Sequence, residues 1–594
     1  MAEEKSRALE AHPLLAWGLW TLMAGAPLLW SNAFIARFTL PKFLALSLGV
    51  LLSALGLALS KGTPLPSLSS PLASSLIASA AALGLSAFFS LNRPLSLAGR
   101  YDSYAYGLWP LALYASAFLL SASLSERRRR QTLRLCLSVG GLIGLYAGLQ
   151  GLGFEILTGV GTLPQGRRAV STLGSPVDLG AYLAALLPLA LHWALKSEER
   201  ALGWVLLLSI TAGLLATLSR GALLGGAAGC ALYLALGSGW GKFRARLKWL
   251  LPVMAAAALL AFAGLRLSSR SVKAADAARP EIWNAAWRVF LDHPWLGTGP
   301  DTFEADFRRY RSEAFIRVMG TQRLQAYAHN DFLQALATTG LAGTFAYAAL
   351  LAALCLAAKR ALDDPAGRQA AAAVCGGLAA LFVVMKFDPV SLEVLVTASV
   401  LSGLLCALPS ARERPPGLRW TVIACGLLFS ALSTACAMRL ARADIAVKSA
   451  SRLYAESPEK ASLLMLKGIR MNPCELSYHV LFVNRLSERV NAAPTFALRR
   501  ELLAQAEALK SEACRPNDVN AHYIQGILSL MQAQVGMKDR LPSAAQALDR
   551  AISLDPDFLP LLRSRLNVAA MMKDQSKAAA ITKRIESLSA LHKD

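Results

Sequence analysis

Long apolar stretches separated by short polar segments fill the first three quarters of the chain. Most are about 18 to 22 residues long, enough for an α-helix to cross a hydrocarbon layer of about 30 Å. The pattern predicts an all-α polytopic membrane protein with twelve to thirteen transmembrane helices, because 201–219 and 221–238 are separated by only Ser219-Arg220-Gly221. The predicted spans are 14–31, 42–60, 72–90, 104–123, 132–150, 176–195, 201–219, 221–238, 247–265, 332–358, 368–386, 389–408 and 419–438.

The basic residues indicate how these spans are oriented. Short cytoplasmic loops are enriched in Lys and Arg, and a cytoplasmic N-terminus puts most such clusters inside. These clusters are Arg127 to Arg130, Lys196 with Arg200, Lys242 to Lys248, Lys359 to Arg368, and Arg412 to Arg419. The net charge of +23 is therefore attributed largely to topology, and no nucleic-acid partner is expected. An odd number of spans places the C-terminal segment outside the cytoplasm, in a bacterial inner membrane protein whose first span remains as an anchor.

After Arg439 the composition becomes that of a soluble helical region. Residues 547–556 match the second helix and turn of a tetratricopeptide unit, and 461–473 are a looser copy. We predict a transmembrane domain at 1–440 and a periplasmic tetratricopeptide-like domain at 441–594, with an unrelated helical bundle as the alternative. Such a solenoid has a concave face suited to a protein partner. Cys474 and Cys514 lie 40 residues apart at similar points of neighbouring repeats, and we do not expect them to form a disulfide.

The segment 266–331, which interrupts the spans, is predicted to be a large periplasmic loop. It carries ten Lys or Arg residues against seven acidic ones. Outer loops normally avoid basic residues, so this composition suggests an anionic ligand. Two amphipathic helices are expected to fold onto the membrane surface, with the Trp rings of the first at the headgroups. Their apolar residues are Ile282, Trp283, Ala286, Trp287 and Phe290 for the first, and Phe303, Phe307 and Tyr310 for the second.

Three sites in or beside this loop are candidates for chemistry. Arg220 lies at the outer end of a span, where it is either a snorkelling end residue or part of a polar cavity. Arg279 begins the first amphipathic helix, and many other basic residues share its loop. His329 and Asn330 precede the next span, where Asn330 or Asp331 could cap a helix whose N-terminus attracts an anion. A structural role for His329 remains open.

The order of these residues resembles the O-antigen ligase superfamily, which includes Wzy-type polysaccharide polymerases and bacterial O-oligosaccharyltransferases. The motifs are Thr217-Leu218-Ser219-Arg220-Gly221, Arg279-x3-Trp283, Pro294-x-Leu296-Gly297-x-Gly299-Pro300-x2-Phe303 and His329-Asn330-x2-Leu333-x2-Leu336-x3-Gly340-x2-Gly343. The segment Arg168-x3-Thr172-x-Gly174-Ser175-Pro176 resembles a further family motif, in which Ser175 and Val177 replace two asparagines. Thr338 stands where relatives often carry Glu.

The resemblance implies a metal-independent inverting glycosyltransferase with a GT-C-like fold and no cofactor. Its donor would be a glycan on undecaprenyl diphosphate, transferred en bloc to an acceptor hydroxyl. Cationic groups must stabilise the leaving diphosphate, and guanidinium suits this task. We therefore assign Arg220 and Arg279 to the diphosphate, with Arg168 and Asn330 as further contacts, and His329 as the base or a diphosphate donor.

The acceptor is left open by the sequence. A ligase acting on lipid A core, a polymerase acting on a glycan, and a protein O-oligosaccharyltransferase share the same donor chemistry. A transporter is the competing class, but its polar sites would lie near the membrane midplane on repeated halves. A membrane-anchored scaffold that works only through its helical repeats would leave the loop motifs unexplained.

Overall fold

The computed structural model describes residues 12–60, 70–157, 168–238, 270–406, 416–504, 506, 509 and 511–591. Within these ranges the chain is helical and contains no strand, which confirms the all-α class. The predicted span at 247–265 and the basic cluster at 242–248 lie outside the described residues, as do Arg412 and Arg414 of the last cluster. The other twelve predicted spans each correspond to a helix.

Eight of the described helices are long and apolar enough to cross a membrane. They are α3 (Leu40–Leu59), α4 (Ser70–Phe88), α7 (Glu126–Gly151), α8 (Pro176–Lys196), α10 (Arg220–Ser238), α16 (Asp331–Asp363), α17 (Arg368–Met385) and α19 (Pro416–Leu453). Four shorter apolar helices pack among them: α2 (Pro13–Leu28), α6 (Leu108–Ala122), α9 (Arg200–Ala216) and α18 (Leu392–Leu405). The protein is therefore a multi-pass membrane protein.

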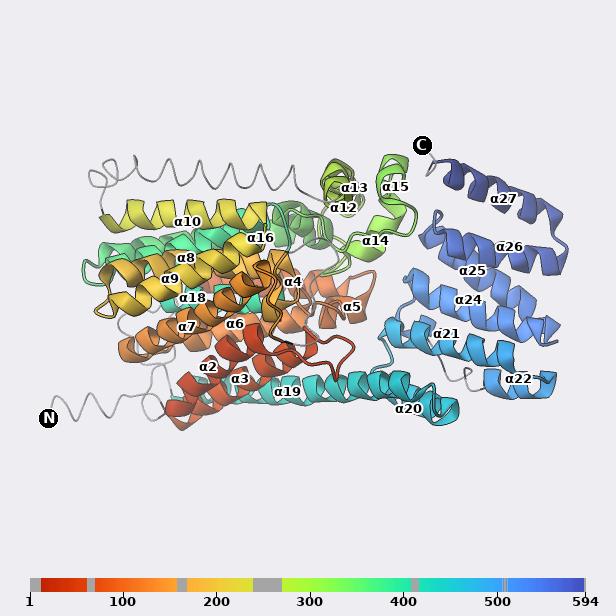
Figure 1. The fold of residues 1–594 in the computed structure, drawn as a ribbon, viewed down its shortest axis with the longest axis horizontal. Helices are drawn as coiled ribbons and strands as arrows, with labels where there is room; N and C mark the ends of the chain where they lie inside the picture. Colours follow the sequence, from red (N-terminus) through yellow and green to blue (C-terminus); the bar gives the residue numbers. More distant parts are fainter. Residues whose placement is uncertain are drawn as a thin grey trace.

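The two ends of the helix bundle differ in what they carry. Figure 1 shows the short helices α12 to α15 and the C-terminal helices together at one end. At the other end, Arg134 near the start of α7 contacts Glu199 in the α8–α9 turn at 3.0 Å, and Arg368 donates to Leu236 O at 3.1 Å. The basic clusters near Lys196 and Arg368 therefore lie at the end opposite the large loop.

The large loop folds around an apolar core of its own. It contains α12 (Arg270–Ala277), α13 (Arg279–Asp292), α14 (Phe303–Tyr310) and α15 (Glu313–Met319). Both predicted amphipathic helices are present as α13 and α14. The apolar residues of α13 lie in two environments, and its location in the headgroup region stays a prediction. Ile282, Ala286 and Phe290 are buried in the protein, whereas Trp283 and Trp287 are 38% and 47% exposed.

A break in α16 fixes this loop to the bundle. Gly340 has φ of +63°, which interrupts the helix and which a residue with a Cβ rarely adopts. The backbone groups released there bind the segment that follows α13: Leu341 N donates to Pro294 O at 2.8 Å, and Gly299 N donates to Thr338 O at 2.9 Å. The segment Pro294 to Gly299 and the break at Gly340 in α16 are therefore held together by backbone hydrogen bonds.

The C-terminal region is a stack of consecutive helices that begins inside α19. The predicted boundary at 440–441 falls within this helix, which continues to Leu453 without a break. The helices that follow are α20 (Pro458–Met471), α21 (Leu476–Ala492), α22 (Phe496–Ala504), α23 (Ser511–Cys514), α24 (Val519–Gln534), α25 (Leu541–Leu554), α26 (Leu559–Met572) and α27 (Gln575–Ala590). Their identification as tetratricopeptide repeats remains a prediction.

Cys474 and Cys514 form a disulfide, so the expectation from their sequence separation was wrong. Their Cα atoms are 5.2 Å apart, inside the range that a disulfide requires. The cause is the stacking of α21 beside α24, which brings Cys474, just before α21, next to Cys514, at the end of α23. Two cysteines 40 residues apart are therefore close enough to form a bond.

Buried polar contacts attach the C-terminal helices to the rest of the protein. The fully buried Asp444 of α19 accepts hydrogen bonds from Ile35 N at 2.6 Å and from the hydroxyls of Tyr478, at 2.8 Å, and Tyr101. Asp555, between α25 and α26, pairs with two arginines of the large loop. These are Arg308 at 3.2 Å and Arg311 at 2.9 Å, with every side chain at most 6% exposed.

Candidate functional site

Arg220 is placed by a tight turn at the end of the bundle that carries the large loop. Leu218 has φ of +50°, and Ser219 N donates to the hydroxyl of Thr217 at 3.1 Å. The chain thereby reverses between α9 and α10, and Arg220 becomes the first residue of α10. Its guanidinium forms an ion pair with Asp276 of α12. The residue is therefore engaged in a polar cluster and is not a free snorkelling side chain.

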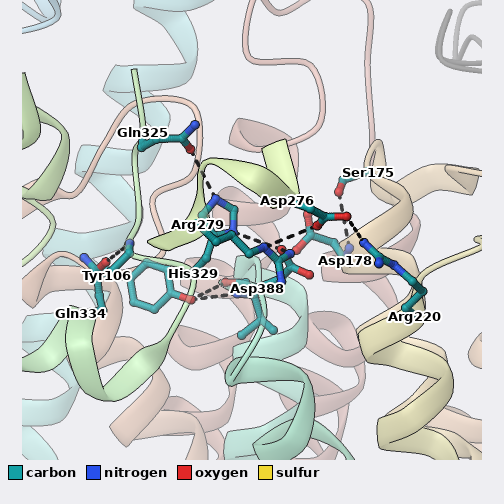
Figure 2. A network of polar contacts seen from close by, with 12 residues as sticks. Tyr106, Ser175, Asp178, Arg220, Asp276, Arg279, Gln325, His329, Gln334 and Asp388 are labelled. Carbon is teal, nitrogen blue, oxygen red and sulfur yellow. Dashed lines mark hydrogen bonds and ion pairs between the residues drawn. The ribbon is translucent and has the colours of Figure 1, made fainter. Parts of the chain in front are cut away.

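Arg279 joins the same cluster from the first turn of α13, where Pro280 occupies an N-terminal helical position. Its Nε lies 3.6 Å from Asp276 Oδ1, and its Nη2 lies 3.4 Å from Asp388 Oδ1. Asp276 thus bridges the two arginines that the sequence selected. Figure 2 shows both guanidinium groups turned toward this carboxylate.

His329 completes the network from the segment before α16. Its Nδ1 donates to Asp388 Oδ1 at 3.1 Å, and its Nε2 lies 3.3 Å from Gln325 Oε1. The residue has φ of +52°, a conformation uncommon for residues other than glycine and enriched at functional sites. Asp388 therefore contacts both Arg279 and His329, which come from opposite ends of the large loop.

The turn that carries Asp388 is held in place from two sides. The hydroxyl of Tyr106 donates to Val390 O at 2.8 Å and accepts from Val390 N at 2.9 Å. On the other side, Ser391 N donates to Asp178 Oδ1 at 2.8 Å (Figure 2). Three contacts on two successive residues leave this turn little freedom, so the Asp388 carboxylate is pre-positioned.

Arg168 and Asn330 lie close to the network in different ways. Arg168 Nε donates to Thr217 O at 2.9 Å, beside the turn that precedes Arg220. Burial lowers the pKa of Arg168, Asp388 raises it, and Arg220 lowers it further. Asn330 caps α16, because its Oδ1 accepts from the backbone N–H groups of Phe332 and Leu333, both at 3.1 Å. Capping was one role expected for Asn330; the diphosphate contact remains a prediction.

The arrangement is suited to an anionic ligand. Three arginines face two carboxylates, and the side chains of the paired groups are 17% to 30% exposed. A ligand can therefore reach them, while the partial burial strengthens electrostatic contacts relative to bulk water. Since guanidinium binds phosphate oxygens through two parallel hydrogen bonds, a phosphate group could replace Asp276 or Asp388 as the partner. Among the described residues, no three His, Cys, Asp or Glu side chains are grouped as metal ligands.

Sequence reasoning missed the two carboxylates that connect the network. Asp276 was counted only as one acid among seven in the loop, and Asp388 lies in a short turn more than 100 residues from Arg279. The available signal was its position in the short polar turn between the predicted spans 368–386 and 389–408. That turn is expected at the same membrane face as the basic loop. Nothing in its local pattern indicated which residues it would meet.

Comparison with known proteins places these residues in a recognised domain. Residues 204–348 match the family model described as O-Antigen ligase. No curated protein matches the chain. The matched segment includes Arg220, Arg279, His329 and Asn330, while Arg168 and Asp388 flank it. The match identifies an O-antigen ligase domain at residues 204–348 of this chain, as the motifs predicted.

Proposed function

We propose that the protein is an inner-membrane glycosyltransferase that moves a glycan en bloc from undecaprenyl diphosphate to an acceptor hydroxyl on the periplasmic face. The observation that supports this most strongly is the meeting of Arg220, Arg279 and His329, from three separate segments, around Asp276 and Asp388. The O-antigen ligase domain at residues 204–348 supports the same reaction class.

The orientation of the site is part of the proposal. The clusters containing Lys196 and Arg368 lie at the end opposite the site, and the positive-inside rule makes that end cytoplasmic. The disulfide between Cys474 and Cys514 lies within the C-terminal helices. Disulfides form and persist in oxidising compartments such as the periplasm. Both arguments support a periplasmic location for the site and the C-terminal helices.

In this reaction the diphosphate leaves the anomeric carbon as the acceptor oxygen attacks. Arg220 and Arg279, with Arg168 beside them, bind the diphosphate and stabilise the charge that develops on it. No metal ion is required for this step in the proposal. His329 either takes the proton of the acceptor hydroxyl, with Asp388 holding its ring through Nδ1, or donates a hydrogen bond to the diphosphate. Inversion follows from a single displacement.

The acceptor distinguishes three candidate reactions. We favour a ligase that acts on lipid A core, because the matched model is described as an O-antigen ligase. A polymerase that extends a lipid-linked glycan is the second candidate, and it uses the same donor site. A protein acceptor comes third, and the C-terminal helices are then proposed to bind a protein partner.

The test is a transfer assay with the full-length protein in nanodiscs. Lipid-linked glycan is supplied with lipid A core, with a second lipid-linked glycan, or with a peptide rich in Ser and Thr, each with and without EDTA. Arg220→Ala, Arg279→Ala and His329→Ala should each lower transfer by at least 100-fold. Arg288→Ala is the matched control, since Arg288 is exposed on the same helix as Arg279. Wild-type turnover in any of the three variants removes that residue from the site, and loss of transfer with EDTA refutes metal independence.

Product size then separates the candidates. A ligase attaches one glycan to each lipid A core, whereas a polymerase produces a ladder that grows by one unit at a time. A protein acceptor gives a glycosylated peptide. If none of the three acceptors is modified by the wild-type protein, the proposed function is wrong.

A further inference from the structure

A cavity lined by both charged and apolar side chains lies away from the arginine cluster, between the large loop and the C-terminal helices. Its volume is about 580 Å³, within the range of known ligand sites. One wall comes from the membrane-side segments and includes Arg100, Glu304 and Arg308. The other comes from α21 and the start of α24, with Glu475, Arg515 and Asp518 among its residues. Ligand sites occur preferentially at such junctions between two folded units.

The charges of the lining cancel, unlike those of the arginine cluster. The three arginines named above face three acids, and the pairs are already formed within the walls. Arg100 contacts Glu304 at 2.8 Å, and Arg515 contacts Asp518 at 3.7 Å and Glu475 at 3.9 Å. A diphosphate would have to displace these carboxylates without any surplus of positive charge. The cavity therefore favours a ligand without net charge.

The side chains nevertheless offer many hydrogen bonds. Guanidinium and amide donors alternate with carboxylate acceptors, and Arg515 Nε is buried with no hydrogen-bond partner among the described residues. A hydroxyl group both donates and accepts, so a polyhydroxylated ligand matches this lining. Leu476, Val480 and Leu481 supply an apolar surface on one side, suited to the C–H faces of sugar rings.

The cavity is connected to the proposed transfer site through two residues. The guanidinium of Arg100 lies over the ring of Tyr327, 5.0 Å from its centroid. Tyr327 precedes His329 by two residues and packs against Tyr106, which holds the turn of Asp388. A chain of sugars that extends from the transfer site therefore has a polar cavity next to it.

From these observations we propose that the cavity is a carbohydrate-binding subsite that holds sugars of the glycan beyond the residue that reacts. This rests on the proposed function, in so far as the glycan is a substrate. The sugars can belong to the donor glycan or to the acceptor glycan, and the ligand chemistry is the same. The two walls are held together by the buried contacts of Asp555 with Arg308 and Arg311, so the subsite is formed before the ligand arrives.

Binding is tested without catalysis. The probe is the oligosaccharide released from its lipid carrier by mild acid, titrated into full-length protein in nanodiscs that carries His329→Ala. Adding Asn484→Trp, which fills the cavity from α21, should weaken binding at least tenfold. Asn491→Trp is the matched control, because Asn491 is exposed two turns further along the same helix and does not line the cavity. Asn520→Ala, a truncation in the part of the same wall that α24 contributes, should weaken binding about threefold or more.

Transfer kinetics identify the source of the sugars. With His329 intact, Asn484→Trp should raise KM for the donor if donor sugars occupy the cavity, or KM for the acceptor if acceptor sugars do. The proposal is overturned if the wild-type lining binds no oligosaccharide, or if Asn484→Trp and Asn520→Ala both bind it normally. If binding is lost in the variants but no protein catalyses transfer, the subsite stands and the proposed function fails. If transfer occurs but both variants bind the oligosaccharide as tightly as the protein with the wild-type lining, the proposed function stands and the subsite fails.

Discussion

Removing the Asp555 carboxylate should release the large loop from the C-terminal helices. Asp555 is fully buried and accepts from both Arg308, at 3.2 Å, and Arg311, at 2.9 Å. Asp555→Ala would leave two guanidinium groups buried opposite a methyl group. Breaking a buried ion pair in this way costs about 3 to 5 kcal/mol, which corresponds to a factor of about 10² to 10⁴ in the equilibrium between docked and undocked loop.

Hydrogen exchange measured by mass spectrometry on the protein in nanodiscs detects this change. Amides of α14 and α15 should exchange faster in Asp555→Ala, while amides of α8 should be unaffected. Asp549→Ala is the control, because Asp549 pairs with Arg565 inside the C-terminal helices, at 3.0 Å. Transfer should fall as well, since the hydroxyl of Ser312, which begins α15, donates to Glu281 of α13 at 2.6 Å. If exchange in α14 and α15 stays within about threefold of both wild type and Asp549→Ala, the ion pairs do not hold the loop.

Three further predictions concern single features of the structure. Asp388→Asn should lower kcat about 10- to 100-fold, the range expected for losing one charge-assisted hydrogen bond of about 1.5 to 3 kcal/mol to His329; a change mainly in KM would contradict that role. Burial raises the pKa of Asp301 to about 7, so the folded state binds its proton more tightly and stability should fall as pH rises from about 4 to about 7. In thermal unfolding, Asp301→Asn should therefore become more stable relative to wild type between pH 5 and pH 8, and an unchanged difference would refute the assignment. Replacing Cys474 and Cys514 by Ser should destabilise the C-terminal helices by about 4 kcal/mol for a closed loop of this length, and a Tm equal to that of the oxidised protein would show that the bridge does not stabilise them.

The helices were predictable because apolar length and periodicity act locally. Spans of about 20 apolar residues must be helical in lipid, since every backbone group has to be satisfied within the segment. The amphipathic helices α13 and α14 could be located from the spacing of their apolar residues, which is also a local property of the sequence. What spacing could not supply was the partner of each face, so the division of α13 between buried Ile282 and exposed Trp283 emerged only from the structure.

The candidate site was predictable in its cationic half. Arg220 stood out because charge at the end of a span is costly. Arg279 shares its loop with many basic residues and was selected through the resemblance of its motif to the O-antigen ligase superfamily. The acids that join them were not distinguishable, since Asp388 meets His329 only through the packing of distant helices. The Cys474–Cys514 bridge escaped prediction for a related reason: it depends on how adjacent helices stack, which the separation of 40 residues does not encode.

The unbroken course of α19 has a mechanical consequence. At 1.5 Å per residue, its 38 residues make a rod of about 57 Å that runs from the helix bundle into the C-terminal stack (Figure 1). A flexible linker would let the C-terminal helices change their orientation relative to the bundle. A continuous helix instead couples the tilt and rotation of its two ends. Motions that admit a long sugar chain are therefore expected in α12 to α15, while the stack stays fixed relative to the bundle.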